Sequence, residues 1–264
     1  MDYSLESYRL IIKRAQSNGY GFLPFARDHN GKAGTIYLRH DVDYSLPLAL
    51  ELAKVNTELE VSGTFFVLLR SHAYNLLSNS SRALVQKIHE LGQHVALHAV
   101  IDAETPEGLE QRLTSDFQFA LREFPFLSPA FSWHNPTGRI IEATATLAEI
   151  GGLTNAYSNY FTREAIYRSD SNMRGSVASF LELVSARQAQ PLQLLFHPLI
   201  WVIGGDRMTA VLAQAWRHLI SEQEKEMREN NLYQEVFPEG MPQSVLTRFT
   251  ESLLAELVDE ERVP

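Results

Sequence analysis

The chain has 264 residues, of which 45% are hydrophobic, and its formal net charge is −9. This length and composition suit one large α/β domain or two small ones, with a substantial core, and the acidic balance argues against nucleic acid or an anionic membrane as the partner. The absence of cysteine excludes disulfides, thiolate zinc sites and cysteine nucleophiles.

The first predicted element is a helix over residues 4–17, with Ser4 as its N-cap and Gly19 just beyond its end. The charges inside this amphipathic segment distinguish it from a signal peptide. No apolar run approaches the length of a membrane span. We therefore expect a cytoplasmic protein without a membrane span.

Strands and helices then alternate along the chain. Apolar runs predict strands at residues 35–40, 63–69, 94–98, 130–133 and 192–196. Helical patterns predict helices over residues 47–60, 80–91, 105–124 and 140–150, followed by two charged tail helices within residues 206–262. This alternation indicates a largely parallel sheet or barrel, and we expect a single domain over residues 1–264 with a core of about residues 35–202.

Polar residues gather where the predicted strands end, which is where α/β folds place their chemistry. Asp41 and Asp43 close the first of these strands, and His98, His134 and His197 close three others. On an extended strand the two carboxylates would face the same way, about 6–7 Å apart. Such a pair is costly unless a cation lies between its members. A divalent metal with one carboxylate as ligand and the other as base is one interpretation; a helix N-cap followed by a solvated turn is the other.

Five segments together resemble a known family: RHDVD (39–43), LGQHVALH (91–98), FSWHNP (131–136), YRSDSNMR (167–174) and LLFHPLIW (194–201). Their order and spacing resemble those of the polysaccharide deacetylases, the NodB-homology carbohydrate esterases similar to family 4, and in particular a divergent branch associated with surface-polysaccharide biosynthesis. The resemblance covers about residues 35–202. It implies a distorted (β/α) barrel with extra helices at both termini, and metal-dependent removal of an N-acyl group from an amino sugar or glycan precursor.

The resemblance also implies residue roles. Asp41 would be the general base and His197 the general acid, while Asp43 and His98 would bind one divalent metal, for which zinc is the expected ion. The family normally has a second histidine four residues after the first, and this chain has Asp102 there. Aspartate can ligate zinc, but this ligand set would shift the preference toward metals that tolerate oxygen donors. Asp102 could equally be a turn residue ahead of the helix cap at Thr105.

The remaining candidates, for contacts with the substrate, are His134, Trp133, Asp170, Arg174 and Trp201. His134 could be a replacement ligand, a substrate contact or a loop residue. Asp170 and Arg174 could orient the catalytic pair or form surface salt bridges. The two tryptophans could stack on a sugar ring or belong to the core.

Several of these residues also allow a purely structural interpretation. His98 and His197 could be buried core histidines, and His94 lies about 13 Å from His98 along a strand, so we expect it to be structural. His40 should point away from Asp41, toward the core or behind the site. The functional alternatives are hydrolysis of another linear or cyclic amide, as in allantoinase-like relatives, and a carbohydrate-binding pseudo-enzyme, which the departure at Asp102 favours.

The sequence does not define an oligomeric state. Apolar positions in the tail could bury against a partner, although we expect them to pack on the barrel: Leu212, Trp216, Leu219, Leu246, Leu253 and Leu257.

Overall fold

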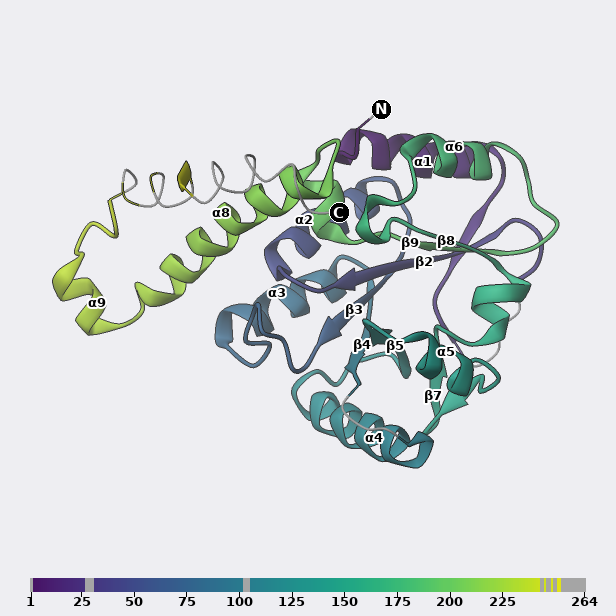
Figure 1. Ribbon diagram of the computed structural model, residues 1–264, viewed down its shortest axis with the longest axis horizontal. Coiled ribbons are helices and arrows are strands. Elements are labelled where there is room, and N and C mark those ends of the chain that lie inside the picture. Colours follow the sequence, from purple (N-terminus) through teal and green to yellow (C-terminus); the bar gives the residue numbers. More distant parts are fainter. Residues whose placement is uncertain are drawn as a thin grey trace.

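The computed structural model shown in Figure 1 describes residues 2–26, 31–101 and 105–242, together with residues 245, 248, 251 and 252. Its helices are α1 (Leu5–Ser17), α2 (Leu46–Glu58), α3 (Asn79–Glu90), α4 (Pro106–Glu123), α5 (Gly138–Thr144), α6 (Val177–Ser185), α7 (Pro198–Ile203), α8 (Met208–Met227) and α9 (Asn231–Val236). A π-helical turn (Tyr160–Glu164) and a 3-10 turn (Ser171–Met173) complete the helical elements. The strands are β1 (Gly21–Leu23), β2 (Thr35–Val42), β3 (Thr64–Leu68), β4 (His94–Val100), β5 (Ala130–His134), β6 (Glu149–Ile150), β7 (Leu153–Asn155), β8 (Ile166–Ser169) and β9 (Leu192–Leu195).

These strands form one sheet in the order β6-β7-β5-β4-β3-β2-β9-β8, with β1 paired to β2. In the described part of the chain every strand pair is parallel except β6–β7. The sheet curls into an open half-barrel with helices around its outside (Figure 1). The predicted distorted (β/α) barrel is confirmed.

Strand β2 shows how the sequence positions the site. All eight of its residues are buried, which is typical of a strand covered on both faces. Ile36 and Leu38 belong to the large core shared with the surrounding helices, whereas Tyr37 belongs to a second core with Phe66 and other residues inside the half-barrel. Because side chains alternate along a strand, Arg39 and Asp41 follow Tyr37 on the inner face.

His40 lies on the outer face of β2 and is completely buried. Its Nδ1 lies 3.3 Å from the carbonyl oxygen of Phe196, and its Nε2 lies 3.1 Å from the Asn56 amide nitrogen. The Tyr8 hydroxyl donates to the Oδ1 atom of Asn56 at 2.5 Å. The expectation that His40 points away from Asp41 is confirmed.

The predicted helix over residues 140–150 was wrong in its second half. Helix α5 ends at Thr144, and residues 149–150 instead form β6, which pairs antiparallel with β7. Gly151 and Gly152, with φ of 59° and 78°, connect the two strands. Positive φ at both positions of a two-residue hairpin loop favours exactly such a Gly-Gly pair, so the sequence did carry the signal for this hairpin.

The C-terminal tail begins as predicted with a long helix. Helix α8 extends from the body of the molecule to α9 at its far end (Figure 1). The second predicted tail helix falls largely outside the described residues, as do Leu246, Leu253 and Leu257. No described helix is long and apolar enough to cross a membrane.

Candidate metal centre and its acid–base residues

The carboxyl ends of four parallel strands bring the candidate site together. Asp41 and Asp43 come from the end of β2, His98 from β4 and His134 from β5. His197 follows β9 and precedes the first residue of α7. A pocket of about 490 Å³ opens above them, and its walls include both aspartates, His134 and His197.

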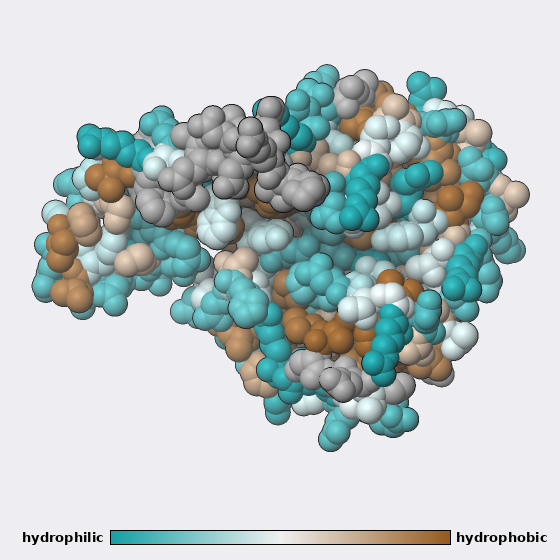
Figure 2. Space-filling model, in the orientation of Figure 1, coloured by the Kyte–Doolittle hydropathy of each residue, from teal (hydrophilic) through white to brown (hydrophobic). Residues whose placement is uncertain are grey.

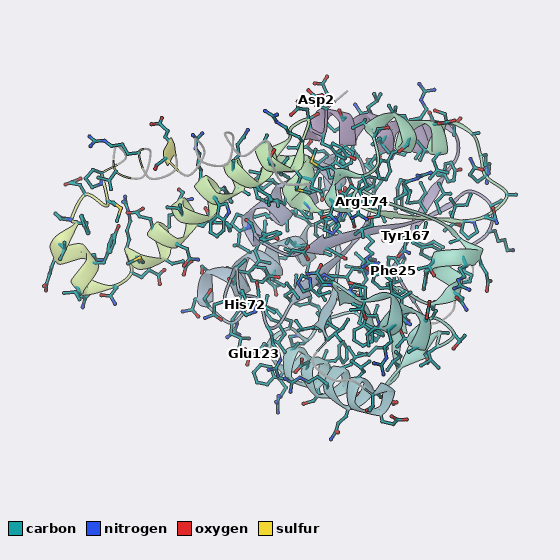
Figure 3. The ribbon with its side chains drawn as sticks, in the orientation of Figure 1. Asp2, Phe25, His72, Glu123, Tyr167 and Arg174 are labelled. Carbon is teal, nitrogen blue, oxygen red and sulfur yellow. The ribbon has the colours of Figure 1, made fainter. Side chains whose placement is uncertain are left out.

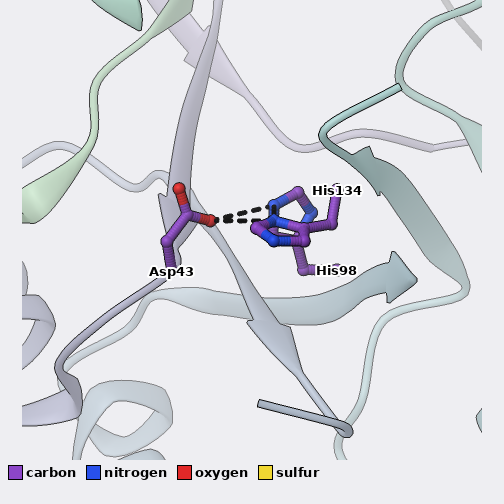
Figure 4. A group of neighbouring side chains, drawn as sticks. All are labelled: Asp43, His98 and His134. Atoms are coloured by element: carbon purple, nitrogen blue, oxygen red, sulfur yellow. Dashed lines mark hydrogen bonds and ion pairs between the residues drawn. The ribbon is translucent and has the colours of Figure 1, made fainter. Parts of the chain in front are cut away.

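Three side chains converge at one point, as Figure 4 shows. Asp43 Oδ1 lies 3.1 Å from His98 Nε2 and 3.4 Å from His134 Nδ1, and these two nitrogens are 3.2 Å apart. An ion bound tetrahedrally at 2.0–2.1 Å from each ligand would separate its ligands by about 3.3–3.4 Å. The three atoms therefore already have the mutual spacing that a small divalent ion requires.

The surroundings of Asp43 also fit a cation. Among the described residues its buried Oδ1 has no partner that meets hydrogen-bond geometry, although a buried carboxylate oxygen normally has one. Burial raises the pKa of Asp43, but the neighbouring imidazoles of His134, His98 and His197 outweigh this effect and hold it well below its usual value. Asp43 is thus an anion whose inward oxygen is left for a ligand.

His98 is oriented from behind. The residue is 3% exposed, and its Nδ1 lies 2.7 Å from the hydroxyl and 3.1 Å from the carbonyl oxygen of Ser132. A histidine whose Nδ1 is bonded in this way presents Nε2 to a metal. Ser132 stands opposite His98 in the β4–β5 pairing, so the register of the sheet holds the ring in place.

His134 is the third member of the group. The sequence left it open as a ligand, a substrate contact or a loop residue, and the structure brings its Nδ1 to Asp43 and His98. Its Nε2 lies 3.1 Å from the side-chain amide of Asn135, which adopts a positive φ of 47° at the end of β5. Asp102, expected to complete the ligand set, lies outside the described residues.

Asp41 lies beside this group and is paired with a buried arginine, Arg39, that was not among the predicted site residues. Arg39 donates from Nε to Oδ1 at 2.8 Å and from Nη2 to Oδ2 at 2.7 Å. Burial raises the pKa of Asp41, but the charge and hydrogen bonds of Arg39, aided by His98 and His197, lower it below its ordinary value. The available signal was the spacing of Arg39 and Asp41, two residues apart on β2, with Asp43 another two residues on, just past the end of the strand.

His197 faces Asp43 from the far side of the pocket, with its Nε2 3.8 Å from Oδ2. Its Nδ1 lies 2.5 Å from Asp170 Oδ1, and its backbone N–H donates to Asp170 Oδ2 at 2.8 Å. Burial lowers the pKa of His197, but the charge and hydrogen bond of Asp170, with Asp43 and Asp41, raise it to about 9. His197 is therefore protonated at neutral pH in this arrangement.

The other substrate candidates are placed differently. Trp201 is fully buried, and its Nε1 donates to Asp170 Oδ2 at 2.7 Å, so it supports Asp170 behind His197 rather than facing the pocket. Trp133 is 1% exposed and donates to Thr144 in the core behind β5. Arg174 is exposed and lies outside the residues that line the pocket. The structure thus brings together the aspartates and histidines, with Asp170 behind them, and keeps both tryptophans away from the pocket surface.

No protein-family model matches the sequence, and no curated protein matches it. The fold is similar to solved structures of low sequence identity. A peptidoglycan deacetylase of Bdellovibrio bacteriovorus is 14% identical over 78% of this chain and 54% of its own, with a TM-score of 0.42. A carbohydrate esterase family 4 esterase of Streptococcus mutans is 14% identical over 74% of this chain and 79% of its own, with a TM-score of 0.46.

A family 4 pseudoenzyme of Bacillus anthracis is 12% identical over 77% of this chain and 65% of its own, with a TM-score of 0.44. The chain therefore spans only about half of the Bdellovibrio protein and about two thirds of the Bacillus one. These structures thus include one described as a deacetylase and one described as a pseudoenzyme. The chain has structural similarity to the polysaccharide deacetylases and pseudoenzymes of carbohydrate esterase family 4.

Proposed function

We propose that this protein is a metal-dependent hydrolase that removes an N-acyl group from an amino sugar in a glycan or glycan precursor. The observation that supports this most directly is the convergence of Asp43 Oδ1, His98 Nε2 and His134 Nδ1 within 3.1–3.4 Å of one another. A buried carboxylate, Asp41, and a protonated imidazole, His197, flank this group. The amino-sugar part of the proposal rests on the resemblance of the sequence motifs.

The three ligands suit zinc, because one carboxylate and two imidazoles are a common catalytic donor set that leaves a position open for water or substrate. Such an ion would supply Lewis-acid chemistry, lowering the pKa of water and polarising an acyl carbonyl. His134 takes the place of the second histidine that the family has four residues after the first. In this proposal Asp102 is not required as a ligand.

Asp41 is the general base. It lines the pocket, and its Oδ2 lies 3.6 Å from His98 Nε2, so it stands within one water of the ligand group. The pairing with Arg39 keeps Asp41 ionised, which is the form that can accept a proton from the attacking water. The same pairing fixes the direction of both carboxylate oxygens.

His197 is the general acid. With Nδ1 held by Asp170, the proton available to the substrate is the one on Nε2, which faces the pocket. A leaving amine needs a proton as the amide bond breaks, and a histidine charged at neutral pH can donate it. Trp201 and the backbone N–H of His197 both donate to Asp170, which keeps that carboxylate in position behind the ring.

The test is release of acetate from N-acetylated amino sugars by zinc-loaded protein, compared with Asp41→Asn and His197→Ala. The proposal expects acetate release that both substitutions reduce by at least about 100-fold, the usual contribution of a positioned acid or base. Release of ammonia or a ring-opened product from other amides, with no acetate, would favour the alternative amide hydrolase. Saturable sugar binding without turnover in any metal-loaded form would indicate a carbohydrate-binding module.

A further inference from the structure

The pocket above the metal ligands continues into a second groove. This groove has a volume of about 500 Å³ and lies between the segment after β3, the start of α3 and the outer half of α8. The two cavities share wall residues, among them Tyr44, Ser71 and His72. Figure 2 shows the indentation between the body and the arm formed by α8 and α9, and Figure 3 labels His72 on the side of the body that faces this arm.

Helix α8 is attached to the site and belongs to the walls of both cavities. Met208 and Leu212 border the metal pocket, and Leu219 and Gln223 border the second groove. These positions follow the repeat of one helical face. The second groove is therefore a continuation of the first along α8.

A hydrogen bond links α8 to the segment that carries the ligand Asp43. His218 Nε2 lies 3.2 Å from the hydroxyl of Ser45, and Ser45 is the N-cap of α2, two residues after Asp43. Val211 and Ala215 of α8 are also buried against Leu48 of α2. These contacts hold the first part of α8 against the segment that carries Asp43, and the groove residues of α8 follow directly after it.

The lining of the second groove indicates what it can hold. Hydroxyl and amide side chains line it about equally with apolar ones, together with His72 and two carboxylates, Glu222 and Glu226. Among the described residues of its walls there is no lysine or arginine to pair with a phosphate or a carboxylate. Tyr44, at the junction of the two cavities, has an exposed fraction of 43%, and an exposed aromatic ring offers an apolar face with a polar edge.

The size of the cavities argues against a single sugar as the whole substrate. The metal pocket alone, at about 490 Å³, falls within the range of sites that enclose one small ligand. A single acylated sugar would leave the second groove empty. A linear chain whose reacting unit sits over the metal ligands would extend past Tyr44 into it.

We propose that α8 forms one wall of a second substrate subsite, which binds the part of an extended, uncharged polyhydroxylated chain that lies beyond the acylated unit. This inference rests on the proposed function. It adds a specific substrate form, a neutral oligosaccharide rather than a nucleotide- or phosphate-linked monosaccharide. It also gives the C-terminal helix a role in substrate selection.

The test compares two variants of α8 on probes of different length. Gln223→Trp fills the second groove, and Gln214→Trp places the same side chain at an exposed position of α8 outside both cavities. The probes are N-acetylglucosamine, its linear β-1,4 tetramer, and a hyaluronan tetrasaccharide as an anionic chain of equal length. Dissociation constants are measured by calorimetry with zinc-loaded protein carrying Asp41→Asn, and acetate release is measured with active protein.

We expect the neutral tetramer to bind at least about tenfold more tightly than the monosaccharide, and the anionic chain to bind more weakly than the neutral one. Gln223→Trp should abolish the advantage of the tetramer, and Gln214→Trp should preserve it. Equal affinity for monomer and tetramer, or equal effects of the two tryptophans, would overturn the subsite. Tight tetramer binding that depends on Gln223, without acetate release by the active protein, would retain the subsite and contradict the proposed hydrolase.

Discussion

Replacing Arg39 by methionine tests the electrostatic arrangement of the site. Methionine keeps the apolar stem of the side chain but removes the charge that faces Asp41. The Arg39 side chain is fully buried and that of Asp41 is 4% exposed, so little solvent can replace the lost partner. Removing one member of such a buried pair costs about 3–5 kcal/mol, because the other charge remains uncompensated.

The expected loss is large enough to measure by either heat or urea. At about 2–4 °C per kcal/mol for a domain of similar size, Tm should fall by about 6–20 °C at pH 7. The deficit should shrink as the pH falls through the pKa of the buried, unpaired Asp41 carboxyl in the variant, because protonation removes the uncompensated charge. The double variant Arg39→Met/Asp41→Asn should be more stable than Arg39→Met alone for the same reason.

Arg70 provides a matched control. Its Nε and Nη2 also donate to one carboxylate, that of Asp116, at 3.2 and 2.9 Å, but its side chain is 48% exposed. Arg70→Met should therefore cost at most about 1 kcal/mol. The reasoning is refuted if Arg39→Met loses no more stability than Arg70→Met, or if adding Asp41→Asn to Arg39→Met lowers the stability further.

Three other predictions address the acid, the core and the metal ligands. Asp170 helps to raise the pKa of His197 to about 9, so Asp170→Asn should move the alkaline limb of the pH profile of kcat for acetate release to lower pH. A limb that does not move would count against His197 as the general acid. Burial lowers the pKa of His40 to about 3, so the stability that its neutral ring contributes is complete above the unfolded pKa of 6.5 and is lost as the pH falls toward 3. Urea titrations should show about 2 kcal/mol less stability at pH 5 than at pH 8 from this group alone. The variant His40→Asn should lack this difference between the two pH values. His134→Ala should lose the zinc, about one equivalent, that His94→Ala retains in elemental analysis, and equal zinc content in the two would exclude His134 as a ligand.

Much of the candidate site could be predicted because functional residues of parallel sheets lie at the carboxyl ends of the strands. Asp41, Asp43, His98 and His197 each follow an apolar run, and parallel pairing places such ends at one edge of the sheet. The Asp170–His197 contact could not be predicted as firmly, because it depends on how the loop after β8 folds against the start of α7. The spacing of Asp170 and His197 along the chain does not indicate that their side chains meet.

The choice between ligands also depends on pairing across strands. The β4–β5 register places Ser132 opposite His98 and His134 opposite Val100, and no pattern within either strand specifies it. Strand alternation could have corrected one expectation, since adjacent residues of a strand face opposite sides. Trp133 and His134 therefore could not both face the pocket, and it is Trp133 that lies in the core.

The most direct test of the account is a crystal structure of zinc-loaded protein with anomalous data collected at the zinc edge. We predict one anomalous peak about 2.0–2.2 Å from Asp43 Oδ1, His98 Nε2 and His134 Nδ1. A zinc ion held by Asp102 without His134, or no peak between these side chains, would contradict it.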